Sequence, residues 1–485
     1  MQPVEISLPI SSLDKTIRVD ISKTSSGDVK LKFKNRYSFR GLSHLVWTWE
    51  LSSNRSANAV ANGSIDVLGR VNATESVTIH LDGAIGSIHN FEKSTKGWNS
   101  YYLNIRGSLR TATVWAESGH TLVTEQFPVE FVFDEETMVG KKSSVFDADS
   151  QNTLSVSQDD SKITVFRHIR SDVRPHVEIC KKTGTILSVM SPSGTNLLSP
   201  GTSLAPNYSR AATDNDSGGM ELIIAFNYPG SGLEKLWMKL FGVSTCSYQF
   251  RWKMVGVDQG KPPQFGCKGT NILEVTDKYV EIEAIVSVTR DGNKDMELIQ
   301  QKIVYHIFID GRVRISNHVI PRAVLKDCVS LARVGVSLAL NKSLYKVQYF
   351  GRGPFENYED RKAAAHMGVY EATPKDMSYH YIFPSENGNR SDCEWVALRA
   401  TSGEGICFCA HDEEESGKRP PFHFSALLHS ATEYHHAKHT CDLEHRENGE
   451  HPIYVNLDHK LMGVAGDVRY VVLPCATSRV TARLL

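Results

Sequence analysis

The feature that most constrains this chain is the alternation of apolar and polar residues over short segments. Residues 16–21 and 29–34 place Ile, Val, Leu or Phe at every second position, with polar or charged residues between them. Residues 303–309 repeat the pattern, and Asp310-Gly311 separates them from a further alternating segment at 313–315. A period of two is typical of half-buried β-strands, and Asp-Gly between two such segments is a strong hairpin signal. The sequence therefore predicts antiparallel sheets.

Helical periodicity is scarce, so an all-β architecture of the sandwich type is expected. The best helical segment covers residues 426–439, and a shorter one covers residues 361–366. A polar stretch, FDEETMVGKKSSVFDADSQNT, interrupts the strand pattern from Phe133 to Thr153. We therefore predict a first sandwich over residues 1–132, a linker over 133–149 and a larger β-domain over 150–485.

Composition limits the partners and the compartment. The net charge is −1 and the pI is about 7.0, with no basic stripe, so a nucleic-acid partner is not expected. The N-terminus lacks the features of a signal peptide, and the apolar run from Met220 to Phe226 is too short to cross a bilayer. The 9 cysteines, an odd number, favour reduced thiols. We expect a cytoplasmic protein with no membrane partner.

Four segments of the larger domain carry an unusual density of polar residues and glycine. They are RAATDNDSGG from Arg210 to Gly219, YFGRGPFENYEDRKAAAHMGVY from Tyr349 to Tyr370, YIFPSENGNR from Tyr381 to Arg390, and YVNLDHKLMGVAGDVRY from Tyr454 to Tyr470. Each could line a site or meet another domain, because glycine-rich loops often do so. For the first three segments, a structural turn or a salt-bridged loop is the simpler interpretation.

Candidate site residues come from these loops. The residues that could face a pocket or another domain are Asp214, Asn215, Asp216, Arg352, Glu356, Asn357, Asp360, Arg361 and Asp467. A retaining glycosidase needs two carboxylates about 5 Å apart across a sugar ring, and closeness in sequence does not establish that geometry. The backbone carbonyls of Phe383 and Pro384 could bind a hard cation, although a plain turn is the simpler account.

Other chemical signatures are weak. His435 and His439 are four residues apart, which would place both on one helix face, but the glutamate of a zinc-protease motif is replaced by His436. Solvated histidines are the simpler interpretation. There is no GxSxG motif, no phosphate loop and no paired CxxC motif, so none of these supports a function.

The four segments, in this order, resemble the C-terminal region of glycoside hydrolase family 2 β-galactosidases. The family pattern is roughly G-x-GP-x-ENY-x-DR, then a YVFPSENG-like segment, then N-x-D-x-x-x-MG-x-GGD. Here the matching segments are GRGPFENYEDR, YIFPSENG and NLDHKLMGVAGD, preceded by RAATDND. The resemblance continues upstream, through KNRYSF at residues 34–39 and ATVWAESGH at residues 112–120. It covers nearly the whole chain.

The resemblance implies an immunoglobulin-like β-sandwich followed by a large β-sandwich similar to galactose mutarotases. In this family the catalytic glutamates and the magnesium ligands belong to a TIM barrel that precedes these domains. No Asn-Glu dipeptide, which marks the acid/base glutamate, occurs here. The resemblance therefore implies no catalytic residue and no cofactor in this chain, and a TIM-barrel domain or chain as its partner. The complete enzyme would use magnesium and sodium and would form a homo-oligomer.

The same family places a tryptophan shortly after its GGD motif, as one wall of the galactose pocket. Tyr470 stands at the matching position, where it could bind a galactoside, but Val468 and Arg469 depart from the family pattern. A second alignment omits this segment and assigns RYVVLP to the final strand, which removes the pocket wall. Phe383 and Pro384 match residues whose carbonyls bind sodium in some relatives.

Two functions of different classes follow. The chain could complete a β-galactosidase whose barrel is elsewhere, acting on terminal non-reducing β-D-galactosides. Alternatively, it could be an inactive carbohydrate-binding or interaction module. The first predicts an apolar surface for a barrel, and the second predicts sugar binding by the isolated chain.

Overall fold

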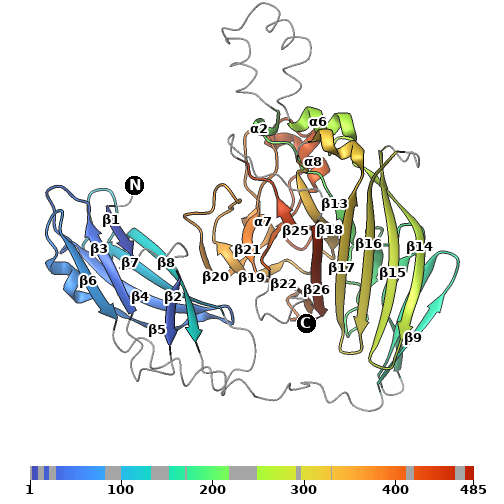
Figure 1. Cartoon of the computed structure of the whole chain (residues 1–485), viewed down its shortest axis with the longest axis horizontal. Coiled ribbons are helices and arrows are strands. Elements are labelled where there is room, and N and C mark those ends of the chain that lie inside the picture. Colours follow the sequence, from blue (N-terminus) through green and yellow to red (C-terminus); the bar gives the residue numbers. More distant parts are fainter. Residues whose placement is uncertain are drawn as a thin grey trace, which may run out of the picture. The chain divides into compact units, whose positions relative to one another are not determined.

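The chain divides into two compact units in the computed structural model (Figure 1). One unit holds residues 1–145 with 366–369, and the other holds residues 146–365 with 370–485. The structure describes residues 3–8, 16–20, 29–81, 100–132, 152–169, 172–217, 248–290, 296–328, 330–410, 420–464 and 476–484. The predicted linker, 133–149, lies outside these residues, and the predicted domain boundaries stay predictions.

The smaller unit is a sandwich of two sheets. One has the order β1-β3-β6 and the other the order β2-β8-β7-β4-β5. Their bounds are β1 Val4–Ser7, β2 Ile17–Asp20, β3 Val29–Asn35, β4 Leu45–Ser53, β5 Ser56–Ser64, β6 Ser76–Leu81, β7 Tyr101–Leu109 and β8 Thr121–Val132, with a 3-10 helix η1 at Asp66–Arg70. In β3, buried Val29, Leu31 and Phe33 alternate with exposed lysines. Phe33 meets Trp47 of the facing sheet edge-to-face, at 5.6 Å between ring centroids, so the two sheets share one core.

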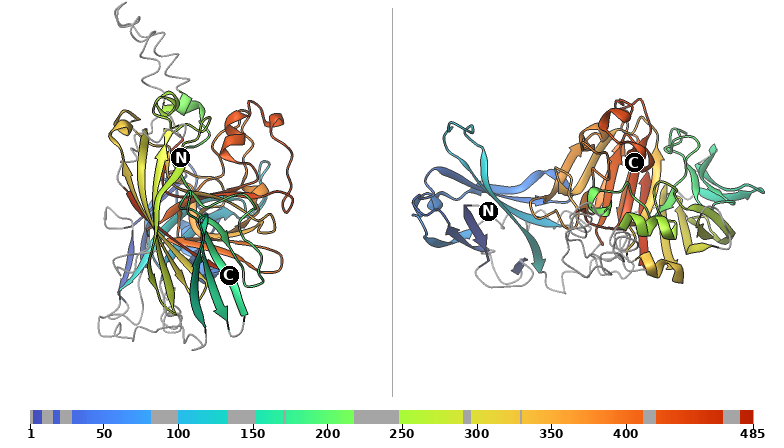
Figure 2. Two further views of the ribbon diagram at one scale, coloured as in Figure 1. Left: turned by 90° about the vertical axis from the view of Figure 1, so that its right-hand side faces the viewer. Right: turned by 90° about the horizontal axis from the view of Figure 1, so that it is seen from above.

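The larger unit contains three sheets. A 4-stranded sheet has the order β12-β11-β10-β9, a 5-stranded sheet the order β13-β18-β25-β24-β21, and a 9-stranded sheet the order β14-β15-β16-β17-β26-β23-β22-β19-β20. The first has strands β9 Thr153–Gln158, β10 Lys162–Ile169, β11 Asp172–Cys180 and β12 Ile186–Val189. The second has β13 Ala205–Asn207, β18 Arg333–Leu340, β21 Arg390–Cys393, β24 Phe422–Leu427 and β25 Ile453–Leu461. The third has β14 Gln264–Val275, β15 Tyr279–Thr289, β16 Glu297–Phe308, β17 Arg312–Pro321, β19 Lys346–Gly353, β20 His366–Ala372, β22 Trp395–Arg399, β23 Gly405–Ala410 and β26 Ala476–Leu484. Figure 2 shows these layers from two further directions.

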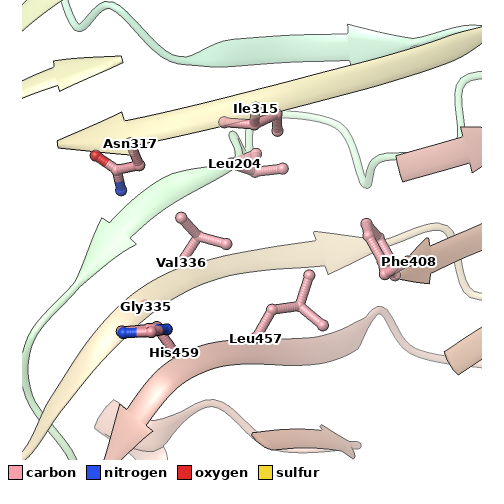
Figure 3. A pocket seen from close by; sticks show the side chains of 8 residues that line it. All are labelled: Leu204, Ile315, Asn317, Gly335, Val336, Phe408, Leu457 and His459. Atoms are coloured by element: carbon pink, nitrogen blue, oxygen red, sulfur yellow. The ribbon is translucent and has the colours of Figure 1, made fainter. Parts of the chain in front are cut away.

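The 5-stranded and 9-stranded sheets face each other across a common apolar core. A small void of about 20 Å³ lies between them, and Figure 3 shows its lining: Ile315 and Phe408 come from the larger sheet, and Val336 and Leu457 from the smaller one. A volume of this size holds about one water molecule. The void is therefore a packing gap inside the sandwich and too small for a ligand.

The 5-stranded sheet has two different faces. Along β18, Val336, Leu338 and Leu340 belong to the apolar core, whereas the alternate positions point the other way. Along β25, Val455 and Leu457 belong to the same core. Because side chains alternate across a sheet, the residues between these core positions point to the opposite, outer face. Ser337, Asn456 and Asp458 belong to that face.

The predicted hairpin at Asp310-Gly311 is confirmed. Strands β16 and β17 pair antiparallel, with Ile307 opposite Val313, and Gly311 has φ +90°. A positive φ is accessible to glycine at little cost, so this residue suits the turn.

The helical predictions were only partly right. The segment 426–439 contains the short helix α8, Ala431–His436, while its first residues end strand β24. A capping box at Ser430 and Glu433 starts that helix, because the serine accepts from the Glu433 backbone and Glu433 accepts in return. Residues 361–366 are not helical: the Ala365 amide closes a turn onto the Lys362 carbonyl, and His366 begins β20.

The remaining helices of the described residues are short. They are α2 Asp214–Ser217, α6 Tyr248–Val255 and α7 Pro374–Met377, with 3-10 helices η5 Ala323–Cys328 and η6 Thr440–Asp442. Strands dominate both units, and the predicted all-β class is confirmed. Within the described part of the chain, no helix has the length and apolar character needed to cross a membrane.

Candidate functional site

Five buried charged residues form a cluster on the outer face of the 5-stranded sheet and in the loops beside it. We call Arg210, Asp216, Arg333, Glu386 and Asp458 the ionic core. All five side chains are almost completely buried. Buried charges are costly unless they are paired, and each member of the ionic core lies within ion-pair distance of an oppositely charged member.

Arg210 and Asp216 of the first motif segment form the first ion pair, and Arg210 also contacts the fourth segment. Arg210 Nη2 donates to Asp216 Oδ1 at 2.7 Å, and its Nε donates to Asp216 Oδ2 at 3.0 Å. The same guanidinium donates to the carbonyls of Met462 at 2.6 Å and Gly463 at 2.8 Å. A planar guanidinium can serve a carboxylate and two carbonyls at once. Arg210 therefore ties the RAATDND loop to the end of β25.

The second group contains Arg333, Glu386 and Asp458. Arg333 Nη2 donates to Glu386 Oε1 at 2.7 Å, and its Nη1 lies 3.6 Å from Asp458 Oδ2. Burial raises the pKa of Asp458 to about 6, against the opposing effect of Arg333. Glu386 adds to this increase because it is a second nearby carboxylate. The desolvation of a charged group explains this direction.

The second motif segment is joined to the third by Glu356. Its carboxylate accepts from Arg361 Nη2 and from the Tyr381 hydroxyl, and its second oxygen accepts from the Gly388 amide at 2.8 Å. Asp360 of the same segment accepts from the Val464 amide at 3.2 Å, which links it to the fourth segment. Both carboxylates thus hold loops together.

Asn357 fixes the loop itself. Its side chain donates to the carbonyls of Arg352 at 3.0 Å and Phe355 at 2.9 Å, and accepts from the Ser391 amide at 2.9 Å. Arg352 pairs in turn with Asp392. These contacts place the GRGPFENYEDR loop firmly against strand β21.

The remaining candidate residues differ in their exposure to solvent. Asp214 and Asn215 are exposed, and Asn215 Nδ2 donates to the Val464 carbonyl at 2.6 Å. Phe383 is about half exposed, whereas Pro384 is buried. Among the described residues, no turn or loop amide donates a hydrogen bond to either of their carbonyls. Asp467 and Tyr470 lie outside the described residues.

Among the described residues, no group of three or more His, Cys, Asp or Glu side chains is arranged to hold a metal ion. This applies to the histidine-rich stretch as well. His435 lies 4.0 Å from Asp258, and His439 precedes the 3-10 helix η6.

Sequence reasoning missed Arg333 as a site residue. It is a lone charged residue in the apolar stretch Leu331–Val336. A charge in a strand that is otherwise buried needs a buried partner, and that signal could have indicated its role.

Comparison with known families decides the assignment. Residues 172–474 match the model described as "Beta galactosidase small chain", and residues 31–130 match "Beta-galactosidase, domain 4". The chain belongs to the β-galactosidase small-chain family. The four motif segments all lie inside the first match.

Curated relatives of this small-chain family member are β-galactosidases. The protein from Vibrio cholerae serotype O1 is 28% identical over 369 residues, covering 76% of this chain and 30% of its own length. The protein from Pseudoalteromonas haloplanktis is 26% identical over 432 residues, covering 89% of this chain and 35% of its own length. The chain thus spans about a third of these relatives. A galactose 1-epimerase from Lactobacillus acidophilus NCFM aligns with a TM-score of 0.34 and 6% identity, covering 69% of this chain and 98% of its own.

Proposed function

We propose that this chain is the C-terminal part of a retaining β-galactosidase that hydrolyses terminal non-reducing β-D-galactosides. A TIM-barrel domain or chain of the same enzyme supplies the catalytic glutamates and the magnesium ion, and this chain completes its pocket. The observation that carries the proposal is the family match over residues 172–474 together with the third of the relatives' length that the chain spans. The chain alone is then expected to be inactive.

An exposed group of apolar residues beside Glu356 suits contact with such a barrel. We call Phe355, Tyr379, Ile382 and Phe383 the apolar rim. Their exposure ranges from 49% for Phe355 and Phe383 to 88% for Ile382. The hydrogen bond from Tyr381 to Glu356 and the packing of Tyr379 on Tyr381, at 4.5 Å between ring centroids, hold these loops together. Clustered exposed apolar residues often mark interaction sites.

Complementation tests this proposal. We expect β-galactosidase activity when the chain is co-expressed with a family 2 barrel chain of the same organism, and none from either alone. Phe383→Asp places a charge in the apolar rim and should lower the activity of the mixture about tenfold or more, as loss of a central contact does. The assay is hydrolysis of o-nitrophenyl β-D-galactoside, with co-purification as a second measurement.

Leu273→Asp is the matched control, because Leu273 is 50% exposed on β14 and outside the apolar rim. It should leave the activity of the mixture unchanged. Mixtures that never gain activity, or equal losses in both variants, would contradict the proposal.

In the assembled enzyme, Tyr470 is proposed to form one wall of the galactose pocket. Tyr470→Ala should then raise KM about tenfold, because an aromatic face that packs on the sugar is lost. An unchanged KM in steady-state kinetics would favour the alignment in which this wall is absent. Sodium, if held by the Phe383 and Pro384 carbonyls, would act as a structural ion near the apolar rim.

A further inference from the structure

A polar groove of about 290 Å³ opens on the outer face of the 5-stranded sheet. Its floor contains Ser337 of β18 and Asn456 of β25, which are cross-strand partners. Gln259 and Thr432, the latter at the start of α8, lie next to each other in the lining, with their side chains hydrogen-bonded at 2.6 Å. The volume is near the lower end of the range for small-molecule sites, roughly 300 Å³. The void in Figure 3, by contrast, lies between the sheets and is far smaller.

Several polar side chains of this groove belong to one hydrogen-bond network, whose two halves are linked by the Ser209 amide donating to Asn207 Oδ1 at 3.2 Å. Asn207 Nδ2 donates to Asn456 Oδ1 at 3.0 Å, and Asn456 Nδ2 donates to Ser425 Oγ at 3.0 Å. On the other side, Ser209 Oγ donates to Gln259 Oε1 at 2.7 Å, and Gln259 Nε2 donates to Thr432 Oγ1 at 2.6 Å. Groups fixed before a ligand arrives lose little entropy on binding, which favours specific recognition.

This network leaves hydrogen-bonding capacity toward the groove. A side-chain amide has two N–H donors, and the bonds above use one from Asn207 and one from Asn456. The Thr432 hydroxyl accepts from Gln259 and keeps its own hydrogen for donation. The Ser337 hydroxyl adds both a donor and an acceptor at the floor. The groove therefore offers mixed donors and acceptors close together.

The lining formed by the described residues is uncharged. None of the 20 described residues that line the groove is Asp, Glu, Lys, Arg or His. The polar groups share the lining with the Tyr454 ring and with three prolines. A ligand with a buried charge would have no counter-ion here and would lose its hydration. Ligands with many neutral hydroxyl groups and apolar C–H faces match both features.

We propose that this groove binds a neutral saccharide. The hydroxyl groups of the sugar would bond to Asn207, Asn456, Ser337 and Thr432, while its C–H face packs on Tyr454. None of the described residues that line this site belongs to the segment around Tyr470, and the site does not depend on a barrel partner. Its occupancy would give the chain a carbohydrate-binding role in addition to completing an enzyme.

Direct binding to the whole isolated chain tests this inference. The probes are D-galactose, D-glucose, lactose and D-glucuronate, followed by saturation-transfer NMR and titration calorimetry. We expect the neutral sugars to bind with millimolar dissociation constants, as suits a small open site, and glucuronate to bind more weakly. Ser337→Leu fills the floor of the groove and should abolish binding, whereas Ser337→Ala should weaken it roughly threefold to tenfold.

Thr432→Val and Thr401→Val make the same chemical change inside and outside the groove. Thr401 is exposed and bonds to Tyr345 instead. The first should weaken sugar binding roughly threefold to tenfold and the second should not change it. Circular dichroism on every variant confirms that the fold is intact.

Three results would overturn the inference. The first is that no neutral sugar binds at concentrations well above the millimolar range. The second is that glucuronate binds as tightly as the neutral sugars. The third is that sugar binding survives Ser337→Leu but is lost in Tyr470→Ala. The last result would place the sugar at the other site. None of these measurements uses enzymatic activity, so failure here leaves the β-galactosidase proposal untouched, and failed complementation leaves this one untouched.

Discussion

At the scale of single residues, the carboxylates of the motif segments serve as connectors. Glu356 binds Arg361, Tyr381 and the Gly388 amide, and Asp216 binds Arg210. A general acid or base needs a substrate proton within reach, and groups already committed to several donors are poorly placed for that role. These residues therefore hold the loops in position.

Arg210→Ala should be strongly destabilising. It leaves Asp216 buried without its cation, and breaking a buried pair costs about 3–5 kcal/mol. Arg174→Ala is the control, because Arg174 pairs with Asp172 while both side chains are about half exposed. Exposed pairs contribute about 0–1 kcal/mol. Urea unfolding should separate the two variants clearly, and similar midpoints would argue against a buried pair.

At the scale of elements, strands β18 and β25 contribute residues to both the ionic core and the groove. Asp458 and Asn456 are two positions apart on β25, and Gly335 and Ser337 are two positions apart on β18. A register shift between Val334 and Gly335 brings Gly335 opposite Asp458. Bulges of this kind reorient side chains near functional sites. The close approach of the two strands leaves no room for a side chain at Gly335.

Gly335→Ala should destabilise the larger unit by about 3 kcal/mol. Its Cβ would collide with the Asp458 carboxylate and the Leu457 carbonyl, and a backbone atom cannot move aside cheaply. Gly266→Ala on β14 is the matched control, since a Cβ there meets no atom within 4 Å. Thermal unfolding should show a large decrease in midpoint for the first variant alone. Equal midpoints would mean that the strands can separate.

At the scale of the whole molecule, the outer face of the 5-stranded sheet carries two different regions, one charged and one uncharged. The inner faces form an apolar core, while the outer face of the 5-stranded sheet carries charges at one end and neutral amides at the other. The charged end costs desolvation energy, which the pairing offsets in part. Stability should therefore depend on pH through the ionic core.

The pKa of Asp458 is raised from 3.8 to about 6 in the folded protein. Ionisation of this carboxyl group therefore lowers the free energy of unfolding. The loss of stability develops as pH rises from about 4 to about 6. A shift of this size corresponds to about 3 kcal/mol. The stability of the natural protein relative to Asp458→Asn should thus fall by about that amount between pH 4 and pH 7.

Urea midpoints of both proteins across this range measure the difference. The buried His176 has its pKa lowered to about 4 by desolvation, so it destabilises the fold as pH falls below about 6.5. Both proteins contain it, and its effect cancels in the comparison. A difference that does not change with pH would contradict the assigned pKa.

The sequence by itself determined the class of fold and the family. Alternation over residues 29–34 and 303–315 specified strands, because a period of two places every apolar residue on one face whatever lies beside it. Four ordered motifs indicated the β-galactosidase region, and the family match agrees. The sequence predicted the limits of α8 less well than it predicted the strands. The helix begins at the capping box of Ser430, and the residues before it pair with β25.

The tertiary structure alone decided which residues meet. Arg210 and Met462, or Arg333 and Glu386, are far apart in sequence, and only the packing of loops on one sheet face brings them together. The groove could not be predicted from the sequence for the same reason. Asn207, Gln259 and Asn456 are far apart along the chain, and only the fold brings them into one hydrogen-bond network. A local pattern predicts which face of a strand is buried. A site forms from contacts between residues far apart in the sequence, which no local pattern predicts.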